Sequence, residues 1–407
     1  MNVAHVALIS FHTCPLASPG EGKAGGMNVY VRELSRCFSS VGVKVDLYTR
    51  CHADHKAAVA QVDENIRVIH LDGGPIDAPL SSYARYLGEF LDNMVGFIDS
   101  NSLRYDVVHS HYWLSAWIGQ RVSKARNVAH CVTFHTLAQL KVQAKAGESE
   151  SSMRFEVERE SMASADLVVA SSPHEREAMV RFYDAPRDRI QVVPCGVDLS
   201  LFRPLDIGES RKKLGLNGEK VIIYVGRVEP IKGLDLLLRS TAIMEGREAL
   251  KVLIVGGNLS QEEEVQKLKD LADELGIASI TEFIGIVDQK HLPMYYSAAD
   301  VCVVPSHYES FGLAALESLA CGTPVVATRV GGLPAVVQHG RNGYLMPWRC
   351  PEPFANSMEV ILYSEGLQRS MSVEARKRAE GMGWENVAQE TLQLYDLVCQ
   401  GVPVPKE

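Results

Sequence analysis

Residues 300–322 read DVCVVPSHYESFGLAALESLACG, which is one complete strand–turn–helix unit. The segment 300–304, apolar after Asp300, predicts a buried strand, and the largely apolar segment that follows the turn predicts a helix ending at a glycine. Runs of this kind, each followed by a helical pattern, recur along the whole chain. Nearly continuous apolar strands that alternate with helices indicate parallel sheets buried on both faces.

Twelve strands are predicted, six in each half of the chain. They are Val6–Phe11, Lys44–Thr49, Asp106–His109, His130–Phe134, Asp166–Ala170, Ile190–Val193, Val221–Val225, Lys251–Val255, Ile280–Ile284, Asp300–Val304, Pro324–Thr328 and Tyr344–Met346. Between the two series, residues 194–204 contain two prolines and a glycine without a regular period, which predicts a linker.

We therefore predict an α/β protein with two Rossmann-like, doubly wound domains, residues 1–195 and 196–383, that face a central cleft. A single barrel of eight repeats is the alternative, and the twelve strands with a central break disfavour it. The last helical pattern, 384–399, either stays with the second domain or packs back on the first.

The composition narrows the class of protein. The chain has 407 residues, a formal net charge of −9 and nine cysteines. The negative charge opposes a broad contact with nucleic acid or anionic lipid. The cysteines form no Cys-x-x-Cys pair, which disfavours zinc and redox motifs and suits a reducing cytoplasm. No apolar stretch is long enough to span a bilayer, and the N-terminal run predicts a strand rather than a signal peptide. We expect a cytoplasmic protein without an integral membrane segment.

Two cations follow the first strand of the second domain, in residues 224–233 (YVGRVEPIKG). Arg227 and Lys232 suit a diphosphate leaving group, the arginine through its planar fork and the lysine as a point charge. The alternative is an exposed loop with two surface charges. Their position at the carboxyl end of a buried strand favours binding.

The strand–turn–helix segment of residues 300–322 carries two carboxylates, Glu309 in the turn and Glu317 inside the apolar helix. A carboxylate on such a helix is costly unless it accepts hydrogen bonds, and vicinal sugar hydroxyls are suitable donors. The backbone amides of Phe311, Gly312 and Leu313 open the helix and can face a phosphate. The alternative is a helix-capping acid with a glutamate paired inside the protein.

The first domain offers a glycine-rich turn, residues 20–28 (GEGKAGGMN), and two polar strand ends, residues 109–113 (HSHYW) and 133–136 (TFHT). The turn lets backbone N–H groups approach a phosphate or sugar, with a flexible loop as the alternative. The strand ends supply hydrogen bonds to a polar ligand. Their histidines lack a cysteine or acidic partner nearby, so no metal is expected. Arg154 lies on a charged helical segment whose pattern predicts a solvated face.

In this order and spacing the motifs resemble those of the retaining glycosyltransferases of the GT-B fold, family four in the sequence-based classification. Residues 18–31 and 109–115 are most similar to the D-inositol-3-phosphate glycosyltransferases of mycothiol biosynthesis, and sucrose-phosphate synthases are more distant. The matching residues are Gly25-Gly26-Met27-Asn28, His135-Thr136, Gly226-Arg227, Lys232-Gly233, Glu309-x7-Glu317 and Gly322-Thr323-Pro324-Val325-Val326.

The resemblance implies a role for each motif: the two cations hold the diphosphate, Glu317 the ribose and Glu309 the transferred sugar. The implied catalytic residues are His135, Arg227, Lys232 and Glu309; the implied donor-binding residues are Gly26, Arg227, Lys232, Glu309, Phe311, Gly312, Leu313 and Glu317; the implied acceptor-binding residues are Asn28, Tyr112, Thr136 and Arg154. The inositol-phosphate enzymes of the family also use a lysine in the segment that here reads PLSSYAR, residues 79–85, which contains none. Arg85 is the candidate replacement.

The implied reaction is a metal-independent transfer, with retained configuration, of a hexose or N-acetylhexosamine. The donor is a nucleotide sugar, foremost a UDP-sugar, and the acceptor a small phosphorylated polyol or sugar. The nucleotide sugar is a co-substrate, so no cofactor is expected, and the absence of an Asp-x-Asp motif counts against a metal clamp. A nucleotide-sugar epimerase or hydrolase of the same fold and a non-catalytic nucleotide-sugar-binding protein are the alternatives. The oligomeric state, a homodimer included, is left open.

Overall fold

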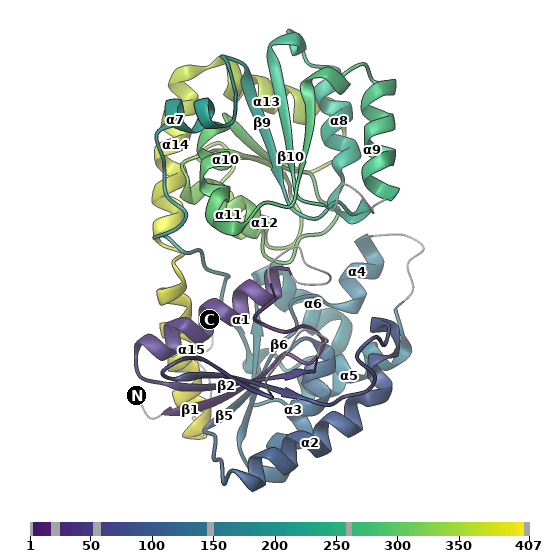
Figure 1. Cartoon of the computed structure of the whole chain (residues 1–407), viewed down its shortest axis with the longest axis vertical. Coiled ribbons are helices and arrows are strands. Elements are labelled where there is room, and N and C mark those ends of the chain that lie inside the picture. Colours follow the sequence, from purple (N-terminus) through teal and green to yellow (C-terminus); the bar gives the residue numbers. More distant parts are fainter. Residues whose placement is uncertain (1–2, 18–24, 52–57, 145–149, 258–262, 403–407) are drawn as a thin grey trace. The chain divides into compact units, whose positions relative to one another are not determined.

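The computed structural model describes residues 3–17, 25–51, 58–144, 150–257 and 263–402 (Figure 1). The chain divides into two compact units, one formed by Met1–Cys195 with Trp384–Glu407 and the other by Gly196–Gly383. Each unit contains its own sheet. Two separate sheets exclude the single barrel, and the α/β class predicted from the alternating pattern is confirmed.

The first unit is built on an eight-stranded sheet with the order β3-β4-β2-β1-β5-β6-β7-β8. All neighbours pair in parallel except β3 and β4, which pair antiparallel. Its elements are β1 (His5–Ile9), α1 (Gly26–Ser40), β2 (Lys44–Arg50), β3 (Val59–Asp63), β4 (Ile66–Leu71), η1 (Leu80–Tyr86), α2 (Leu87–Ser100), β5 (Val107–His111), α3 (Trp113–Arg126), β6 (Ala129–Thr133), α4 (Ala138–Ala144), α5 (Ser152–Ser164), β7 (Leu167–Ala170), α6 (Pro173–Tyr183), η2 (Arg187–Arg189), β8 (Ile190–Val192) and α15 (Trp384–Cys399).

The last helix, α15, belongs to the first unit, which is one of the two placements that the sequence left open. It packs against α1 (Figure 1). The rings of Tyr30 and Trp384 lie 5.4 Å apart, and those of Phe38 and Tyr395 lie 5.8 Å apart. These aromatic contacts join the two ends of the chain in one core.

The second unit is built on a six-stranded, all-parallel sheet with the order β11-β10-β9-β12-β13-β14. Its elements are α7 (Ile207–Lys213), β9 (Lys220–Val225), η3 (Pro230–Lys232), α8 (Leu234–Ala242), η4 (Arg247–Ala249), β10 (Leu250–Val255), α9 (Glu263–Glu274), η5 (Ala278–Ile280), β11 (Thr281–Gly285), η6 (Gln289–His291), α10 (Leu292–Ala298), β12 (Val301–Val304), α11 (Leu313–Ala320), β13 (Val325–Thr328), α12 (Leu333–Val336), β14 (Gly343–Met346), α13 (Pro351–Tyr363) and α14 (Glu365–Glu380).

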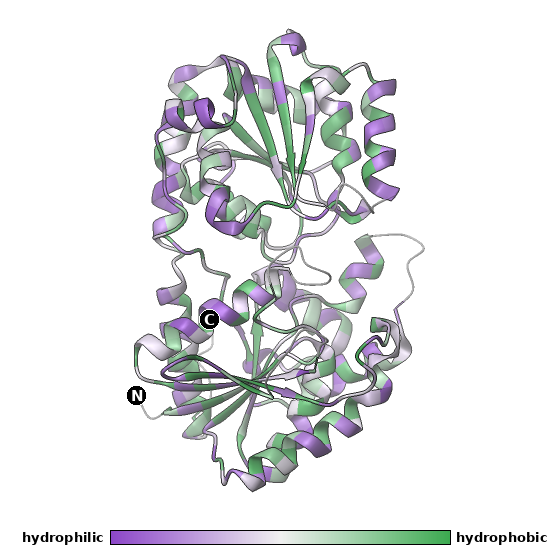
Figure 2. Ribbon diagram, viewed as in Figure 1, coloured by the Kyte–Doolittle hydropathy of each residue, from purple (hydrophilic) through white to green (hydrophobic). Residues whose placement is uncertain are grey.

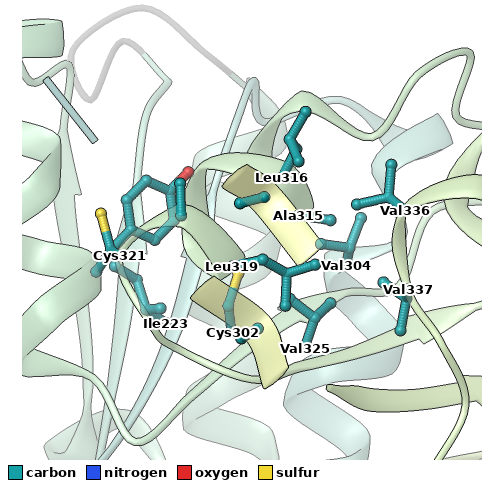
Figure 3. Packing of buried hydrophobic residues seen from close by; sticks show 14 of the residues in the cluster. Ile223, Cys302, Val304, Ala315, Leu316, Leu319, Cys321, Val325, Val336 and Val337 are labelled. Carbon is teal, nitrogen blue, oxygen red and sulfur yellow. The ribbon is translucent and has the colours of Figure 1, made fainter. Parts of the chain in front are cut away.

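Both faces of the second sheet are buried. Successive residues of β9 alternate between two apolar clusters: Ile223 packs with α10 and α11, and Ile222 packs with α8 and α13. Figure 3 shows the first cluster, in which Leu319 of α11 lies against Cys302 and Val325 of the sheet. The strands are largely hydrophobic, whereas an outer helix such as α9 carries hydrophilic turns (Figure 2). This burial on both faces explains the continuous apolar runs of the sequence.

The order of strands reverses once in each sheet. In the first sheet β1 lies between β2 and β5, and in the second β9 lies between β10 and β12. In open α/β sheets, ligands bind beyond the carboxyl ends of the strands on either side of such a reversal. The segments after β1, β5, β9 and β12 are therefore the places where site residues are expected, and each contains residues singled out by sequence.

Candidate active site

Lys232 and Glu309, which are distant in sequence, form an ion pair at the carboxyl end of the second sheet. Lys232 ends η3 after β9, Glu309 lies in the turn after β12, and the Lys232 Nζ lies 2.7 Å from Glu309 Oε2. Their side chains are about one-fifth exposed, at 19% and 18%. The structure thus brings together one of the two predicted diphosphate cations and the predicted sugar-binding carboxylate, with both groups open to solvent.

Two glycines allow the turn that carries Glu309 to pack closely against neighbouring loops. Gly233 has φ +67°, and a Cβ there would lie 2.3 Å from the carbonyl oxygen of Pro305. Gly331 has φ +51°, and a Cβ there would lie 1.8 Å from the carbonyl oxygen of Glu309. Only glycine fits either position, because the conformation is left-handed and the neighbouring atom belongs to the backbone. The two loops fix the position from which Glu309 projects.

Arg227, the other predicted diphosphate cation, pairs with a different acid. Its Nη1 lies 2.7 Å from Glu229 Oε1 in a half-exposed ion pair. The buried Tyr224 donates its hydroxyl hydrogen to the carbonyl oxygen of Arg227 at 2.7 Å and so fixes the backbone there. The guanidinium group is held at the surface by a single exposed acid, which a diphosphate can outcompete because it carries more charge.

The turn after β12 leads into α11, whose N-cap residue Gly312 has φ +82°. Phe311, Gly312 and Leu313 lie at this helix start, where the first backbone N–H groups have no partner within the helix and favour an anion. Glu317 lies one turn further along and is buried. The Tyr296 hydroxyl donates a hydrogen bond to Glu317 Oε2 at 2.9 Å.

The carboxyl of Glu317 has a perturbed pKa. Burial raises this pKa to about 7, although the hydrogen bonds from Tyr296 and Gln289 act in the opposite direction. The alternative predicted from the sequence, a glutamate paired inside the protein, therefore holds in part: Glu317 is buried and accepts hydrogen bonds from other side chains of the protein. Such an acid titrates near neutral pH, which is typical of functional positions.

In the first unit, two residues predicted to be functional have unusual backbone conformations. Tyr112 follows β5 with φ +78°, and His135 follows β6 with φ +62°. The Tyr112 backbone N–H donates to the carbonyl oxygen of Thr133 at 2.9 Å. Non-glycine residues with positive φ are uncommon, and they cluster at ligand-binding and catalytic sites. Sequence motifs alone gave no indication of this strain.

Buried histidines line the ends of β5 and β6. His111 Nδ1 lies 3.0 Å from His135 Nε2, and the His109 ring bonds both Thr133 Oγ1, at 2.8 Å, and the Tyr395 hydroxyl. Burial lowers the pKa of each of these histidines, to about 3 for His111 and well below the usual range for His109 and His135. They are neutral near pH 7. The three histidines therefore form a polar but uncharged surface, here called the histidine wall.

Arg154 is buried, contrary to the solvated position that its charge pattern predicts. Only 2% of its side chain is exposed. Its Nε donates to Glu158 Oε1 at 2.8 Å, and its Nη2 donates to the carbonyl and hydroxyl oxygens of Thr136 at 2.9 and 3.1 Å. The guanidinium carbon lies 5.0 Å from the centre of the Tyr112 ring. Arg154 and Glu158 lie four residues apart on α5, and they form an ion pair inside the protein instead of on a solvated face.

The structure therefore brings together three of the four predicted acceptor-binding residues: Tyr112, Thr136 and Arg154. The fourth, Asn28, is buried in the first turns of α1. Its Nδ2 donates to Thr13 Oγ1 and to the carbonyl oxygen of Cys14, at 2.9 and 2.6 Å. The side chain of Asn28 holds the loop after β1, so its direct contact with a ligand stays a prediction.

Gly26 is exposed at the first position of α1. Residues 18–24, which include most of the glycine-rich segment, lie outside the described residues. Arg85, the candidate replacement for the missing lysine, is exposed on η1.

Among the residues that the structure describes, no group of three or more His, Cys, Asp or Glu side chains could hold a metal ion. Nor does any described helix combine the length and apolar character needed to cross a membrane.

Two protein-family models match the sequence. Residues 24–201 match "Glycosyltransferase Family 4", and residues 206–378 match "Glycosyl transferases group 1". The first match covers most of the first unit and the second match most of the second.

Curated relatives are similar over almost the whole chain. The D-inositol 3-phosphate glycosyltransferase of Thermobispora bispora is 37% identical over 419 aligned positions, which cover 99% of this chain and 97% of the relative. The enzyme of the same name from Corynebacterium diphtheriae is 36% identical, covering 97% of this chain and 95% of the relative.

Solved structures have the same fold. The sucrose-phosphate synthase of Thermosynechococcus elongatus superposes with a TM-score of 0.90 at 32% identity, covering 98% of this chain and 100% of the other. HepE of Anabaena, solved in complex with UDP, superposes with a TM-score of 0.78 at 18% identity, covering 97% of this chain and 99% of HepE. The latter likeness shows the fold alone. From its sequence relatives and its fold, the chain belongs to the GT-B glycosyltransferases of family four, the family that includes the D-inositol 3-phosphate glycosyltransferases.

Proposed function

We propose that this glycosyltransferase moves a hexose or N-acetylhexosamine from a UDP-sugar to a small phosphorylated polyol or sugar, with retained anomeric configuration. The observation that carries the acceptor assignment is the buried Arg154, held against Thr136 and Tyr112. A guanidinium beside a hydroxyl group and an aromatic ring recognises a phosphate better than a neutral sugar requires. The relatives named for transfer to D-inositol 3-phosphate support the same acceptor class.

The proposed chemistry depends on charge placed at the leaving group. Lys232 and Arg227 neutralise the diphosphate, and Glu309 accepts hydrogen bonds from the transferred sugar once the diphosphate engages Lys232. The acceptor hydroxyl attacks from the face that the diphosphate leaves, and its proton passes to the departing phosphate oxygen. The neutral His135 segment steadies the positive charge that develops on the sugar. Positioning and leaving-group stabilisation supply most of the rate.

Product analysis tests the function. The purified chain is incubated with UDP-, ADP- and GDP-sugars and with phosphorylated and dephosphorylated forms of polyol and sugar acceptors. We expect a glycosylated phosphorylated product whose anomeric configuration, determined by NMR, equals that of the donor. Turnover of the donor without an acceptor would instead indicate an epimerase or hydrolase. Donor binding without any turnover would indicate a binding protein.

The reaction is expected to need no divalent metal. Two cationic side chains are available for the diphosphate, and the sequence contains no Asp-x-Asp motif. Activity should stay within about twofold of its initial value after treatment with excess EDTA, because side-chain charge replaces the metal. EDTA already saturated with magnesium serves as the matched control. Loss of activity that magnesium or manganese restores would contradict the assignment.

Donor binding is expected to tighten as the pH rises from about 6 to about 8. The carboxyl of Glu317, whose pKa burial raises to about 7, accepts hydrogen bonds from ribose hydroxyls best when ionised. Below the pKa the ionised fraction falls about tenfold per pH unit, and affinity should fall with it. Calorimetry with an intact nucleotide sugar measures this, because its diphosphate diester does not titrate in the range.

Glu317→Gln keeps the shape of the side chain and removes its ionisation. This variant should bind the donor with nearly the same affinity at every pH in the range. A pH dependence that persists unchanged in Glu317→Gln would assign the titration to another group and remove Glu317 from the donor site.

A further inference from the structure

One carboxylate, that of Glu150, bridges two cations in the first unit. Its Oε1 lies 2.8 Å from the Nζ of Lys141, and its Oε2 lies 3.1 Å from the Nη1 of Arg154. Lys141 belongs to α4, and Arg154 to α5. The two cations therefore reach the same anionic group from different elements, each through its own oxygen.

The bridge runs from the interior to the surface. The exposed fraction of the side chain is 2% for Arg154, 16% for Glu150 and 39% for Lys141. Burial alone would raise the pKa of Glu150, but Lys141 and Arg154 outweigh burial and lower it, so this side chain is an anion near pH 7. A solute can reach the outer edge of this site without unfolding the chain around it.

The charges of the cluster cancel in pairs. Inside, the guanidinium of Arg154 is balanced by Glu158, which is fully buried. At the surface, Lys141 is balanced by Glu150. When the Glu150 side chain swings outward, one uncompensated positive charge and the Nη1 donor of Arg154 become available together. An ammonium beside a guanidinium donor is a good site for a phosphate group.

We propose that Lys141 is the second cation of the acceptor-phosphate site and that the Glu150 carboxylate occupies the phosphate position in the free protein. This inference rests on the proposed function, because it assigns a partner to the phosphate that Arg154 is proposed to bind. It also supplies a cation for an acceptor site that has no lysine in residues 79–85. The acceptor phosphate displaces the Glu150 side chain and takes one contact from each cation.

Four single variants test the inference. Lys141→Met removes the second cation, and Glu150→Gln removes the internal anion. Lys124→Met, at an exposed position of α3, and Glu177→Gln, in an exposed ion pair with Arg187, are the matched controls. Binding of inorganic phosphate to each protein is measured by titration calorimetry, and transfer is measured by kcat and KM for a phosphorylated acceptor and its dephosphorylated form.

Glu150→Gln should bind inorganic phosphate about three- to tenfold more tightly than the wild type and lower the KM for the phosphorylated acceptor by a similar factor, because the competing anion is gone. Lys141→Met should weaken the binding of inorganic phosphate by about tenfold or more and raise the KM for the phosphorylated acceptor by a similar factor, because a charge-assisted contact is lost. Both effects should appear in the KM for the phosphorylated acceptor, whereas the loss of a merely structural salt bridge would affect both acceptors equally.

Phosphate affinities of Lys141→Met and Glu150→Gln that equal those of the controls would overturn the inference, even if phosphorylated acceptors are used normally. The converse result separates the two proposals. If phosphate affinity follows the expected order but no phosphorylated acceptor is glycosylated, the anion site formed by Lys141 and Arg154 stands and the proposed acceptor is wrong.

Discussion

Lys232→Ala is expected to lower kcat by about a hundredfold or more, as the loss of one preformed group that stabilises developing charge does in other enzymes. The effect should fall on kcat, because negative charge on the diphosphate is greatest as the bond to the sugar breaks. The substitution also leaves Glu309 without the partner that lies 2.7 Å away. Turnover of a saturating donor measures the effect, and Lys232→Arg, which keeps the charge, should recover part of it.

Arg227→Ala should cause a loss of the same order, and here the structure provides a matched control. Arg227 is paired with Glu229 in a half-exposed ion pair. Glu229→Gln removes this competitor without touching the guanidinium group, so its kcat should equal or exceed that of the wild type. If Lys232→Ala and Arg227→Ala both turn over at nearly the normal rate, the leaving group is not stabilised by these cations.

Arg154→Ala is expected to lower kcat/KM for phosphorylated acceptors by about a hundredfold or more and to change it little for neutral acceptors, because a charged group that contacts the phosphate is removed. It should also lower the free energy of unfolding by about 3–5 kcal/mol, because Glu158 is left as an unpaired buried charge. Chemical denaturation measures the second effect, and acceptor kinetics measure the first.

The loss of stability could by itself reduce activity, so a second variant separates the two effects. Arg154→Met combined with Glu158→Gln removes both charges of the buried pair and keeps most of the volume. Removal of both partners costs less than removal of one. The double variant should therefore recover much of the stability but none of the use of phosphorylated acceptors. Equal use of neutral and phosphorylated acceptors by the wild type would refute the role of Arg154.

The sequence predicted the α/β fold well because buried parallel strands carry a pattern that does not depend on distant partners. All twelve predicted strands are present, with ends shifted by at most two residues. Two strands, β3 and β4, were missed. β3 is almost wholly exposed, and β4 is interrupted by Arg67 and His70, so neither gives a continuous apolar run. Arg67 is held by a two-point ion pair with Asp46 of the neighbouring β2, a contact that local pattern does not reveal.

The candidate site was harder to predict where it depends on which side of a helix faces inward. The spacing of residues 150, 154 and 158 is visible in the sequence, but the same spacing fits a solvated face and a buried ion pair. Arg154 faces inward toward Thr136, which follows β6 and accepts two of its hydrogen bonds. Lys141 lies only nine residues before Glu150, yet nothing in the intervening sequence indicates that their side chains meet.

The return of α15 to the first unit has a consequence for synthesis of the chain. The core of that unit includes Trp384 and Tyr395, so a nascent chain of 195 residues that emerges from the ribosome lacks part of its own interior. The hydrogen bond between the Tyr395 hydroxyl and His109 Nδ1 is also absent until α15 is made. The second unit, residues 196–383, is a continuous segment and is complete before α15. The unit that begins first in the sequence is therefore completed after the second unit, and its histidine wall is assembled only once α15 has been made.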